Sequence, residues 1–158
     1  MKKIRLYLDT SVISHLEAPD TPEKMRETLA LWEDIKAGKY EIVLSGVVDK
    51  ELNDCHEPKR QILYDFLAMI DYSKVIVNDE VRNIADEIIK LDILKPKHYL
   101  DCSHIGCAII SQSDYIVSWN FKHLVNIKTV NGVRAITNLF NYKPIDIIPP
   151  SMLVNKED

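Results

Sequence analysis

The chain has 158 residues, of which 46% are apolar and 28% are charged. This balance is typical of a soluble globular domain and excludes the disordered, collagen-like and low-complexity classes. Lys and Arg number 20 against 24 Asp and Glu, which gives a formal net charge of −4. No overall positive field attracts nucleic acid, so a nucleic-acid partner would have to be held by local cations or through a metal ion.

The sequence shows no signal for export, membrane insertion or disulfide formation. Arg5 and Asp9 interrupt the first apolar stretch, which therefore does not resemble a signal peptide. The apolar run over 105–110 has six residues, whereas a membrane span needs about 20. The three cysteines form an odd count without Cys-x-x-Cys spacing, which suits a reducing compartment. We therefore expect a cytoplasmic protein without a membrane partner.

Strands and helices are expected to alternate along the chain. In chain order they are a strand (4–8), a turn of helix that Thr10 or Ser11 caps, a helix from Thr21-Pro22 to Gly38, a strand (40–44), a helix that Ser45 caps, a helix (58–70), a strand (74–77), a helix from Asn78 towards Pro96, a helix (100–111), a strand (115–118), a helix (133–140) and a strand (146–148). This alternation predicts an α/β protein with a parallel sheet and helices on both faces. Without a repeat or linker, one domain is expected.

Four side chains are expected near the carboxyl ends of the strands, where open α/β sheets bind their ligands. Asp9 ends the first strand, and Asn120 follows the fourth. Glu51 lies in the helix after the second strand, and Asp101 opens the helix that leads to the fourth. An acid on the apolar face of a helix needs a partner, so Asp101 is a candidate for a site.

Each of these groups also has an ordinary structural explanation. Asp9 can simply cap a helix, and Glu51 can be a surface charge on an amphipathic segment. His104, on an apolar helix face, is more often a hydrogen-bonded core residue than a metal ligand. A zinc site built from Cys102, His104 and Cys107 is disfavoured, because the two cysteines point about 140° apart on a helix.

The segment after the fourth predicted strand is polar and aromatic. Lys122 and His123 are candidates for a phosphate contact, although a charged loop is usually only solvated. The sequence has neither Gly-x-Gly-x-x-Gly nor Gly-Lys-Ser/Thr. It therefore gives no support for the binding of dinucleotides or nucleoside triphosphates.

Taken in order, the motifs resemble those of the PIN-domain ribonucleases, which include the VapC-like toxins. They are Asp9 after the first strand, Glu51 in Val-Val-Asp-Lys-Glu-Leu, Asp101 in Asp-Cys-Ser-His-Ile-Gly-Cys-Ala, and Trp-Asn before Lys-His. The resemblance spans about residues 3–148. It implies one PIN-like nuclease domain over 1–158 with a short C-terminal tail, built as a three-layer α/β/α fold whose central, mainly parallel sheet has about five strands. It also implies metal-dependent endonucleolytic cleavage of RNA that leaves a 5′-phosphate and a 3′-hydroxyl.

The resemblance also assigns roles to individual residues. The catalytic, metal-binding acids would be Asp9, Glu51 and Asp101, the further metal ligand Asn120, and the substrate-binding residues Thr10, Ser11 and Lys122. Asn120 departs from the family pattern, which commonly has a fourth acid there. The implied metal is Mg²⁺ or Mn²⁺, because hard cations prefer oxygen ligands, and it would activate water and stabilise charge on the phosphate. Three crowded carboxylates are expected to raise the pKa of at least one of them.

These observations predict a Mg²⁺- or Mn²⁺-dependent endoribonuclease that is the toxin of a type II toxin–antitoxin pair. Its expected partners are an RNA substrate and a cognate antitoxin, and a homodimer is a further candidate assembly. Two alternatives stay open. Asn120 in place of an acid favours a catalytically weak PIN-like module that binds RNA or a protein, and the same acids would also serve a metal-dependent hydrolase of small phosphoesters.

Overall fold

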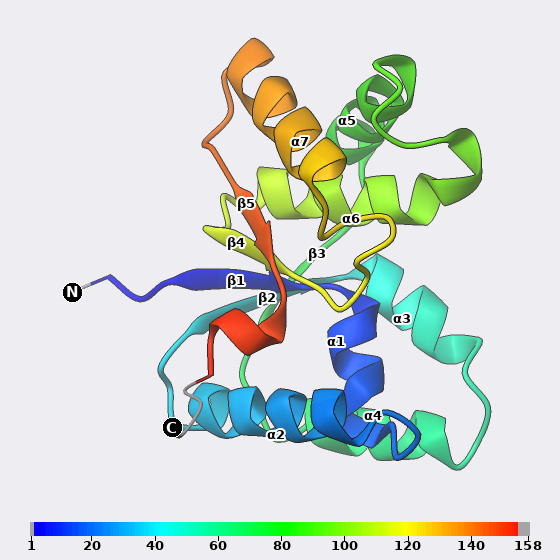
Figure 1. The fold of residues 1–158 in the computed structure, drawn as a ribbon, viewed down its shortest axis with the longest axis vertical. Helices are drawn as coiled ribbons and strands as arrows, with labels where there is room; N and C mark the ends of the chain where they lie inside the picture. The colour runs from blue at the N-terminus through cyan, green and yellow to red at the C-terminus, as the bar shows by residue number, and fades with distance from the viewer. Residues whose placement is uncertain (1, 155–158) are drawn as a thin grey trace.

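A five-stranded sheet forms the centre of the computed structural model, which describes residues 2–154 (Figure 1). Its strands are β1 (Arg5–Leu8), β2 (Glu41–Ser45), β3 (Ser73–Val75), β4 (Tyr115–Val117) and β5 (Asp146–Ile148). They lie in the order β3-β2-β1-β4-β5, and each neighbouring pair is parallel. The predicted sheet of about five mainly parallel strands is thus confirmed, and in the described residues it is wholly parallel.

Helices cover both faces of the sheet, which gives the three-layer α/β/α PIN-like architecture (Figure 1). In residues 2–154 the α-helices are α1 (Thr10–Ser14), α2 (Pro22–Lys36), α3 (Gly46–Asn53), α4 (Lys59–Leu67), α5 (Asp79–Lys90), α6 (Tyr99–Ile110) and α7 (Ile127–Leu139). In Figure 1, α5, α6 and α7 lie above the sheet and α1, α2 and α4 below it. Across the described part of the chain, every helix is too short or too polar to cross a membrane.

The central strand β1 connects the two layers because both of its faces are buried. Tyr7 points into the apolar cluster that contains α5, α6 and α7, whereas Leu6 and Leu8 point into the cluster that contains α1, α2 and α4. All three side chains have no exposed surface. A strand covered on both faces needs apolar residues at every position, which explains the continuous apolar run in the sequence.

Side-chain caps fix where several helices begin. Ser45 and Asn78 accept hydrogen bonds from the backbone N–H groups of α3 and α5, as the sequence predicted. The expected cap of the first turn of helix is wrong. Asp9, and not Thr10 or Ser11, accepts from the N–H of Val12 at the start of α1.

Helix α7 begins earlier than the sequence predicted. The expected helix covered 133–140, but α7 spans Ile127–Leu139 and Asn126 caps it. Asn131-Gly132 is a dipeptide typical of turns, yet it lies inside this helix. Packing explains why glycine lies inside the helix. A Cβ at Gly132 would lie 2.6 Å from Cγ2 of Ile93, so the absence of a side chain lets Ile93 approach α7.

Other element ends differ from their predicted positions by a few residues. The predicted strand 74–77 is observed at Ser73–Val75, and the predicted helix 58–70 is observed at Lys59–Leu67. The helix expected to run towards Pro96 ends at Lys90. Two residues later, Asp92 takes a left-handed backbone conformation with φ of 58°. The chain leaves the helix at this point, and the conformation is one that aspartate tolerates better than most residues.

Candidate active site

The carboxyl ends of β2, β1 and β4 meet at one edge of the sheet. Strands β2 and β3 lie on one side of the central strand β1, and β4 and β5 lie on the other side. The direction in which successive strands are added to the sheet therefore reverses between β1 and β4. Open α/β sheets bind ligands at such a point. Asp9 follows β1 there, Ser45 ends β2, and Ser118 follows β4.

Asp9 is held rigidly at this edge. Its side chain is 3% exposed, and both carboxylate oxygens accept hydrogen bonds. Oδ1 accepts from the hydroxyl of Ser11 at 2.6 Å and from the N–H of Val12 at 3.3 Å, and Oδ2 accepts from the hydroxyl of Ser118 at 2.5 Å. Burial raises the pKa of Asp9, while His104 and the hydrogen bonds oppose the rise. The result is a preorganised carboxylate at the centre of the sheet edge.

Glu51 reaches the same edge from helix α3. Its Oε1 lies 2.6 Å from Nε2 of His104 and accepts a hydrogen bond of 2.8 Å from the hydroxyl of Thr10. Burial of Glu51 favours its neutral form, but the bonds from His104 and Thr10 outweigh burial and lower its pKa. Glu51 is therefore a half-buried, oriented carboxylate, and the surface-charge explanation is wrong.

His104 belongs to a buried chain of hydrogen bonds. Its Nδ1 lies 2.7 Å from the hydroxyl of Tyr7, which lies 2.7 Å from Oγ of Ser45. The side chain is 2% exposed, and its other ring nitrogen is the one that meets Glu51. Its position supports the role of a hydrogen-bonded core histidine. Through this chain the core of the sheet fixes the direction in which Glu51 points.

The structure gives no support to a zinc site at the cysteines of α6. Cys102 and Cys107 have no exposed surface, and burial raises the pKa of Cys102 to about 12 and that of Cys107 to about 11. A thiolate is the form that binds zinc, and such pKa values disfavour it. In residues 2–154 neither cysteine belongs to a group close enough to share an ion.

Asp101 lies in the first turn of α6, where it faces two histidines. Its Oδ2 is 3.1 Å from Nδ1 of His123, and its side chain is 22% exposed. Burial raises the pKa of Asp101, and the negative charge of Glu51 raises it further, while His104 and His123 oppose the rise. The expected rise in pKa thus occurs at Asp9 and Asp101, but burial causes it more than the crowding of like charges does.

Glu51 is hydrogen-bonded to His104, but the three predicted acids do not form one tight cluster. Interaction with His104 works to lower the pKa of all three carboxyl groups, and Glu51 works to raise that of Asp101. In the described residues, the group whose atoms lie close enough to share an ion is instead His98, Asp101 and His123, with one ligand atom of each within 4.8 Å of the others.

His98 was not among the site residues predicted from the sequence, and His123 was predicted only as a candidate phosphate contact. The rings of these two histidines lie 3.7 Å apart between centroids, with 37° between their planes. Loss of hydration and the neighbouring His123 hold the pKa of His98 below its ordinary value. One signal was present, because His98 precedes Asp101 by three residues at a helix start, and such a pair lies on one face.

Asn120 shapes the loop that carries His123. Its Oδ1 accepts a hydrogen bond of 3.0 Å from the backbone N–H of His123, and its Nδ2 lies 3.4 Å from Nδ1 of that residue. The backbone N–H of Asn120 donates to Oγ of Ser118. Asn120 therefore connects the hydroxyl that binds Asp9 with the histidine that meets Asp101.

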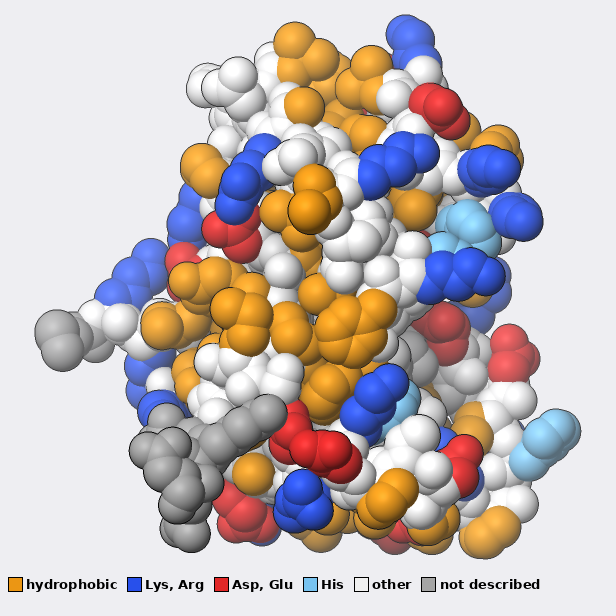
Figure 2. Space-filling view, viewed as in Figure 1, with side chains coloured by type: hydrophobic (Ala, Val, Ile, Leu, Met, Phe, Trp, Pro, Cys, Tyr) orange, Lys and Arg blue, Asp and Glu red, His pale blue; other side chains and the backbone are white. Residues whose placement is uncertain are grey.

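The predicted substrate-binding residues fall into two groups. The hydroxyls of Thr10 and Ser11 are hydrogen-bonded to Glu51 and Asp9, where they orient the acids. Lys122 is exposed and lines a hollow of about 280 Å³ beside the two histidines. Three further lysines line it: Lys95, Lys97 and Lys128. Figure 2 shows Lys and Arg side chains gathered around histidine on this side, over the start of α6.

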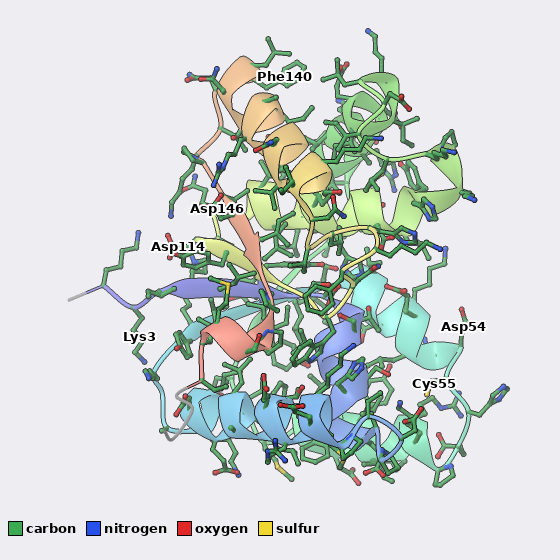
Figure 3. The ribbon with its side chains drawn as sticks, viewed as in Figure 1. Lys3, Asp54, Cys55, Asp114, Phe140 and Asp146 are labelled. Atoms are coloured by element: carbon green, nitrogen blue, oxygen red, sulfur yellow. The ribbon has the colours of Figure 1, made fainter. Side chains whose placement is uncertain are left out.

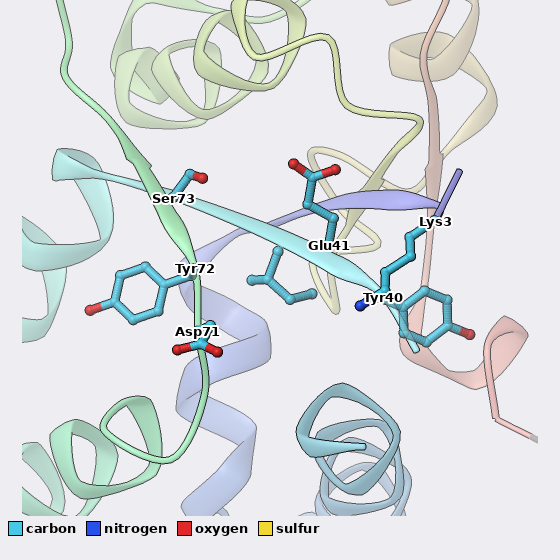
Figure 4. Close-up of a pocket in the computed structure, with 7 residues that line it drawn as sticks. Lys3, Tyr40, Glu41, Asp71, Tyr72 and Ser73 are labelled. Carbon is cyan, nitrogen blue, oxygen red and sulfur yellow. The ribbon is translucent and has the colours of Figure 1, made fainter. Parts of the chain in front are cut away.

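Two other regions lie away from this edge. A hollow of about 490 Å³ is lined by residues at the amino ends of β2 and β3, among them Glu41, Tyr72 and Ser73 (Figure 4). It lies at the end of the sheet opposite to Asp9, and no predicted site residue lines it. Asp54 and Cys55, beyond the end of α3, lie at the outer surface of the molecule (Figure 3).

Comparisons with known proteins support the fold. A scan of protein-family models finds no match to the chain, and a search of curated proteins finds no relative. Among solved structures, a chain of VapBC2 from Rickettsia felis, crystallised bound to a DNA fragment from their promoter, is similar with a TM-score of 0.55. The match has 12% sequence identity and covers 92% of this chain and 98% of that chain. At this identity, the likeness establishes a shared fold over nearly the whole chain.

Proposed function

We propose that the protein is a metal-dependent endoribonuclease. The observation that carries the proposal is that hydrogen bonds link three carboxylates, from three separate segments, at the sheet edge where this fold reverses its strand order. Asp9 comes from the end of β1, Glu51 from α3 and Asp101 from α6. Their assembly from distant parts of the sequence is typical of a site built for chemistry and not of a solvated surface.

The donor set suits Mg²⁺ or Mn²⁺, because these ions prefer carboxylate oxygens. The hydrogen bonds that Glu51 accepts from Thr10 and His104 both use Oε1, which leaves Oε2 as a ligand atom. Asp101 is partly exposed and reachable by solvent. A bound divalent ion would supply activation of water and stabilisation of charge on the scissile phosphate.

The residues around the acids hold them in place for this role. Ser118 and Ser11 fix the plane of the Asp9 carboxylate, and His104 and Thr10 fix that of Glu51. Preorganised charges cost little rearrangement when a substrate arrives. The buried Tyr7 and Ser45 hold His104 in turn, so they act as positioning residues.

The basic hollow supports RNA as the substrate class. The net charge of −4 gives no general attraction for a polyanion, yet four lysines line one hollow beside Asp101 and His123. Lysine side chains near the proposed catalytic carboxylates can hold backbone phosphates on either side of a cleaved bond. We propose Lys122 as one of these contacts, and Asn120 as the residue that orients this loop and a further candidate metal ligand.

A cognate antitoxin is the partner that we propose for this nuclease. The similar Rickettsia felis structure is a VapBC2 assembly bound to promoter DNA, and its fold covers nearly this whole chain. We also propose that one domain comprises residues 1–158, and light scattering tests whether it forms a homodimer.

Cleavage of a labelled RNA tests the proposed function. We expect cleavage with Mn²⁺ or Mg²⁺, none with EDTA, and at least a 100-fold loss in Asp9→Asn or Glu51→Gln, because positioned catalytic groups contribute about 10²- to 10⁴-fold. Asp54→Asn is the matched control, since Asp54 ends the same helix as Glu51 but lies at the surface (Figure 3). Equal rates in Glu51→Gln and Asp54→Asn would contradict the proposal.

One observation favours the alternative of a binding module without catalysis. Both oxygens of Asp9 are already hydrogen-bonded, so a metal ligand at this position would have to share them. If the wild-type protein binds RNA but leaves it intact with every divalent ion, the binding module is the correct function. Turnover of a chromogenic phosphoester without cleavage of RNA would identify the small-molecule hydrolase instead.

A further inference from the structure

We propose that His98, Asp101 and His123 form a binding site for a transition-metal ion such as Zn²⁺ or Co²⁺, which shares Asp101 with the proposed nuclease site. One ligand atom of each residue lies within 4.8 Å of the other two, and all three side chains are partly exposed, so an ion can enter from solvent. The site goes beyond the proposed function, because it requires binding only and no cleavage of RNA.

The three ligands come from three segments that the fold holds together. His98 ends a short 3-10 helix (Pro96–His98), and its backbone N–H donates to the carbonyl of Lys95. Asp101 lies one turn later, in α6. His123 is fixed in the loop after β4, where its carbonyl accepts a hydrogen bond of 2.6 Å from Thr129. The backbone of each ligand is therefore anchored before any ion arrives.

The contacts among the ligands already bring their donor atoms together. His123 meets Asp101 at 3.1 Å, and the His98 ring stacks on the His123 ring at 3.7 Å. Binding of an ion would exchange the hydrogen bond between His123 and Asp101 for coordination. Rotations of side chains would bring the ligand atoms onto one ion, because these atoms already lie within 4.8 Å of one another.

The donor set determines which ions the site prefers. Two imidazole nitrogens and one carboxylate oxygen suit Zn²⁺, Co²⁺, Ni²⁺ and Fe²⁺, whereas Mg²⁺ prefers oxygen ligands alone. The oxygen-rich edge at Asp9 and Glu51 has the opposite preference. The two proposed sites would thus differ in selectivity and share Asp101, and the histidine site would be the tighter one for transition metals.

Metal binding by the full-length chain, after removal of metal with a chelator, tests the site. We expect one Co²⁺ per chain by visible absorption and one Zn²⁺ by calorimetry, with Mg²⁺ unable to displace either. His98→Gln and His123→Gln should each weaken Zn²⁺ binding at least about 10-fold. Loss of a residue that only supports a ligand already costs about this much, and these two residues would be ligands themselves. Circular dichroism confirms that each variant is folded, and His98→Gln keeps the test valid if His123→Gln unfolds.

Matched variants separate this site from nonspecific metal binding elsewhere on the chain. His56→Gln should bind Zn²⁺ like the wild type, because His56 is exposed in the loop before α4 and outside the group. Glu51→Gln should also keep its Zn²⁺ affinity while losing RNA cleavage. The proposal is overturned if the wild type binds no Zn²⁺, if both histidine variants keep full affinity, or if His56→Gln loses it. Zn²⁺ binding without any RNA cleavage would contradict the proposed function and leave this site intact.

Discussion

Asp9 caps helix α1 and also places a buried carboxylate at the end of β1. The two roles use the same atom, since Oδ1 accepts the N–H of Val12 and the hydroxyl of Ser11. The cap holds the carboxylate at a fixed angle to the sheet, and burial makes its charge costly. The cap and the proposed chemical role therefore coincide at Asp9, so the helix cap and the site carboxylate that the sequence suggested are not exclusive.

The pH dependence of stability should have opposite signs at Glu51 and Asp101. The pKa of Asp101 is raised in the folded state, so the unfolded chain loses this proton first and stability falls as pH rises between the unfolded and folded pKa values. The pKa of Glu51 is lowered, so its contribution is complete above the unfolded pKa and is lost as pH falls through the folded one. Relative to the wild type, Asp101→Asn should gain stability as pH rises through the acidic range, and Glu51→Gln should lose it.

Urea unfolding of both variants at a series of acidic pH values, with EDTA present, measures these differences. Asp20→Asn serves as the control, because Asp20 is an exposed acid in the loop before α2. Its curve should run parallel to that of the wild type. Shifts of the same sign in Glu51→Gln and Asp101→Asn would show that their surroundings differ from the contacts described above.

The sequence predicted which acids lie at the sheet edge, but not the groups that orient them. Asp9 and Asn120 follow strands, so correct positions of the strands along the chain were enough to place them at the carboxyl ends of a parallel sheet. The bond from Tyr7 to His104 joins residues 97 positions apart, and its partners become known only when β1 and α6 pack together. His98 was missed for a similar reason. It precedes β4 in the sequence, whereas His123, whose ring contacts it, follows β4.

At the scale of single elements, helix α7 shows how packing overrides a local signal. Gly132 lies within it, although glycine costs about 1 kcal/mol relative to alanine in a helix interior. The contact with the buried side chain of Ile93 accounts for this choice, because no Cβ fits there. The start of α3 was predicted from its cap, Ser45, whereas the start of α7 was missed although the side chain of Asn126 caps it.

Gly132→Ala should therefore destabilise the protein despite the better helix propensity of alanine. Forcing a methyl group against Ile93 costs about 1–3 kcal/mol, against a gain of about 1 kcal/mol from propensity. We expect a net loss of about 1 kcal/mol in the free energy of unfolding by urea. Gly46→Ala is the matched control, since nothing lies within 4 Å of a Cβ at Gly46 in the first turn of α3. Equal stability of the two variants would contradict the packing explanation.

At the scale of the whole molecule, the fold was the most predictable feature. Apolar runs separated by helices require a parallel sheet with crossovers, and the buried faces of β1 then place one helical layer on each side. The distribution of charge was less predictable. The lysines that line the hollow come from two segments, 95–97 and 122–128, which lie together only because η2 (Pro96–His98) and the loop after β4 meet beside Asp101.

This uneven distribution of charge predicts how RNA binding responds to salt. If the four lysines of the hollow each neutralise one phosphate, the slope of log affinity against log salt should be roughly −3, since single strands lose about 0.7 per contact. Lys122→Ala should reduce the slope by about 0.7. Fluorescence anisotropy of a labelled RNA measures it, with EDTA present and in the Asp9→Asn background so that the RNA stays intact.

Lys36→Ala is the control for this measurement, because Lys36 pairs with Glu33 on α2, which covers the other face of the sheet. Its slope should equal that of the Asp9→Asn parent. Removal of a lysine that binds phosphate should lower the affinity for all RNA sequences by the same factor, because the backbone carries the same charge at every nucleotide. If Lys122→Ala and Lys36→Ala change the slope equally, the RNA is bound by the general surface, and the hollow beside His98 and His123 is not its binding site.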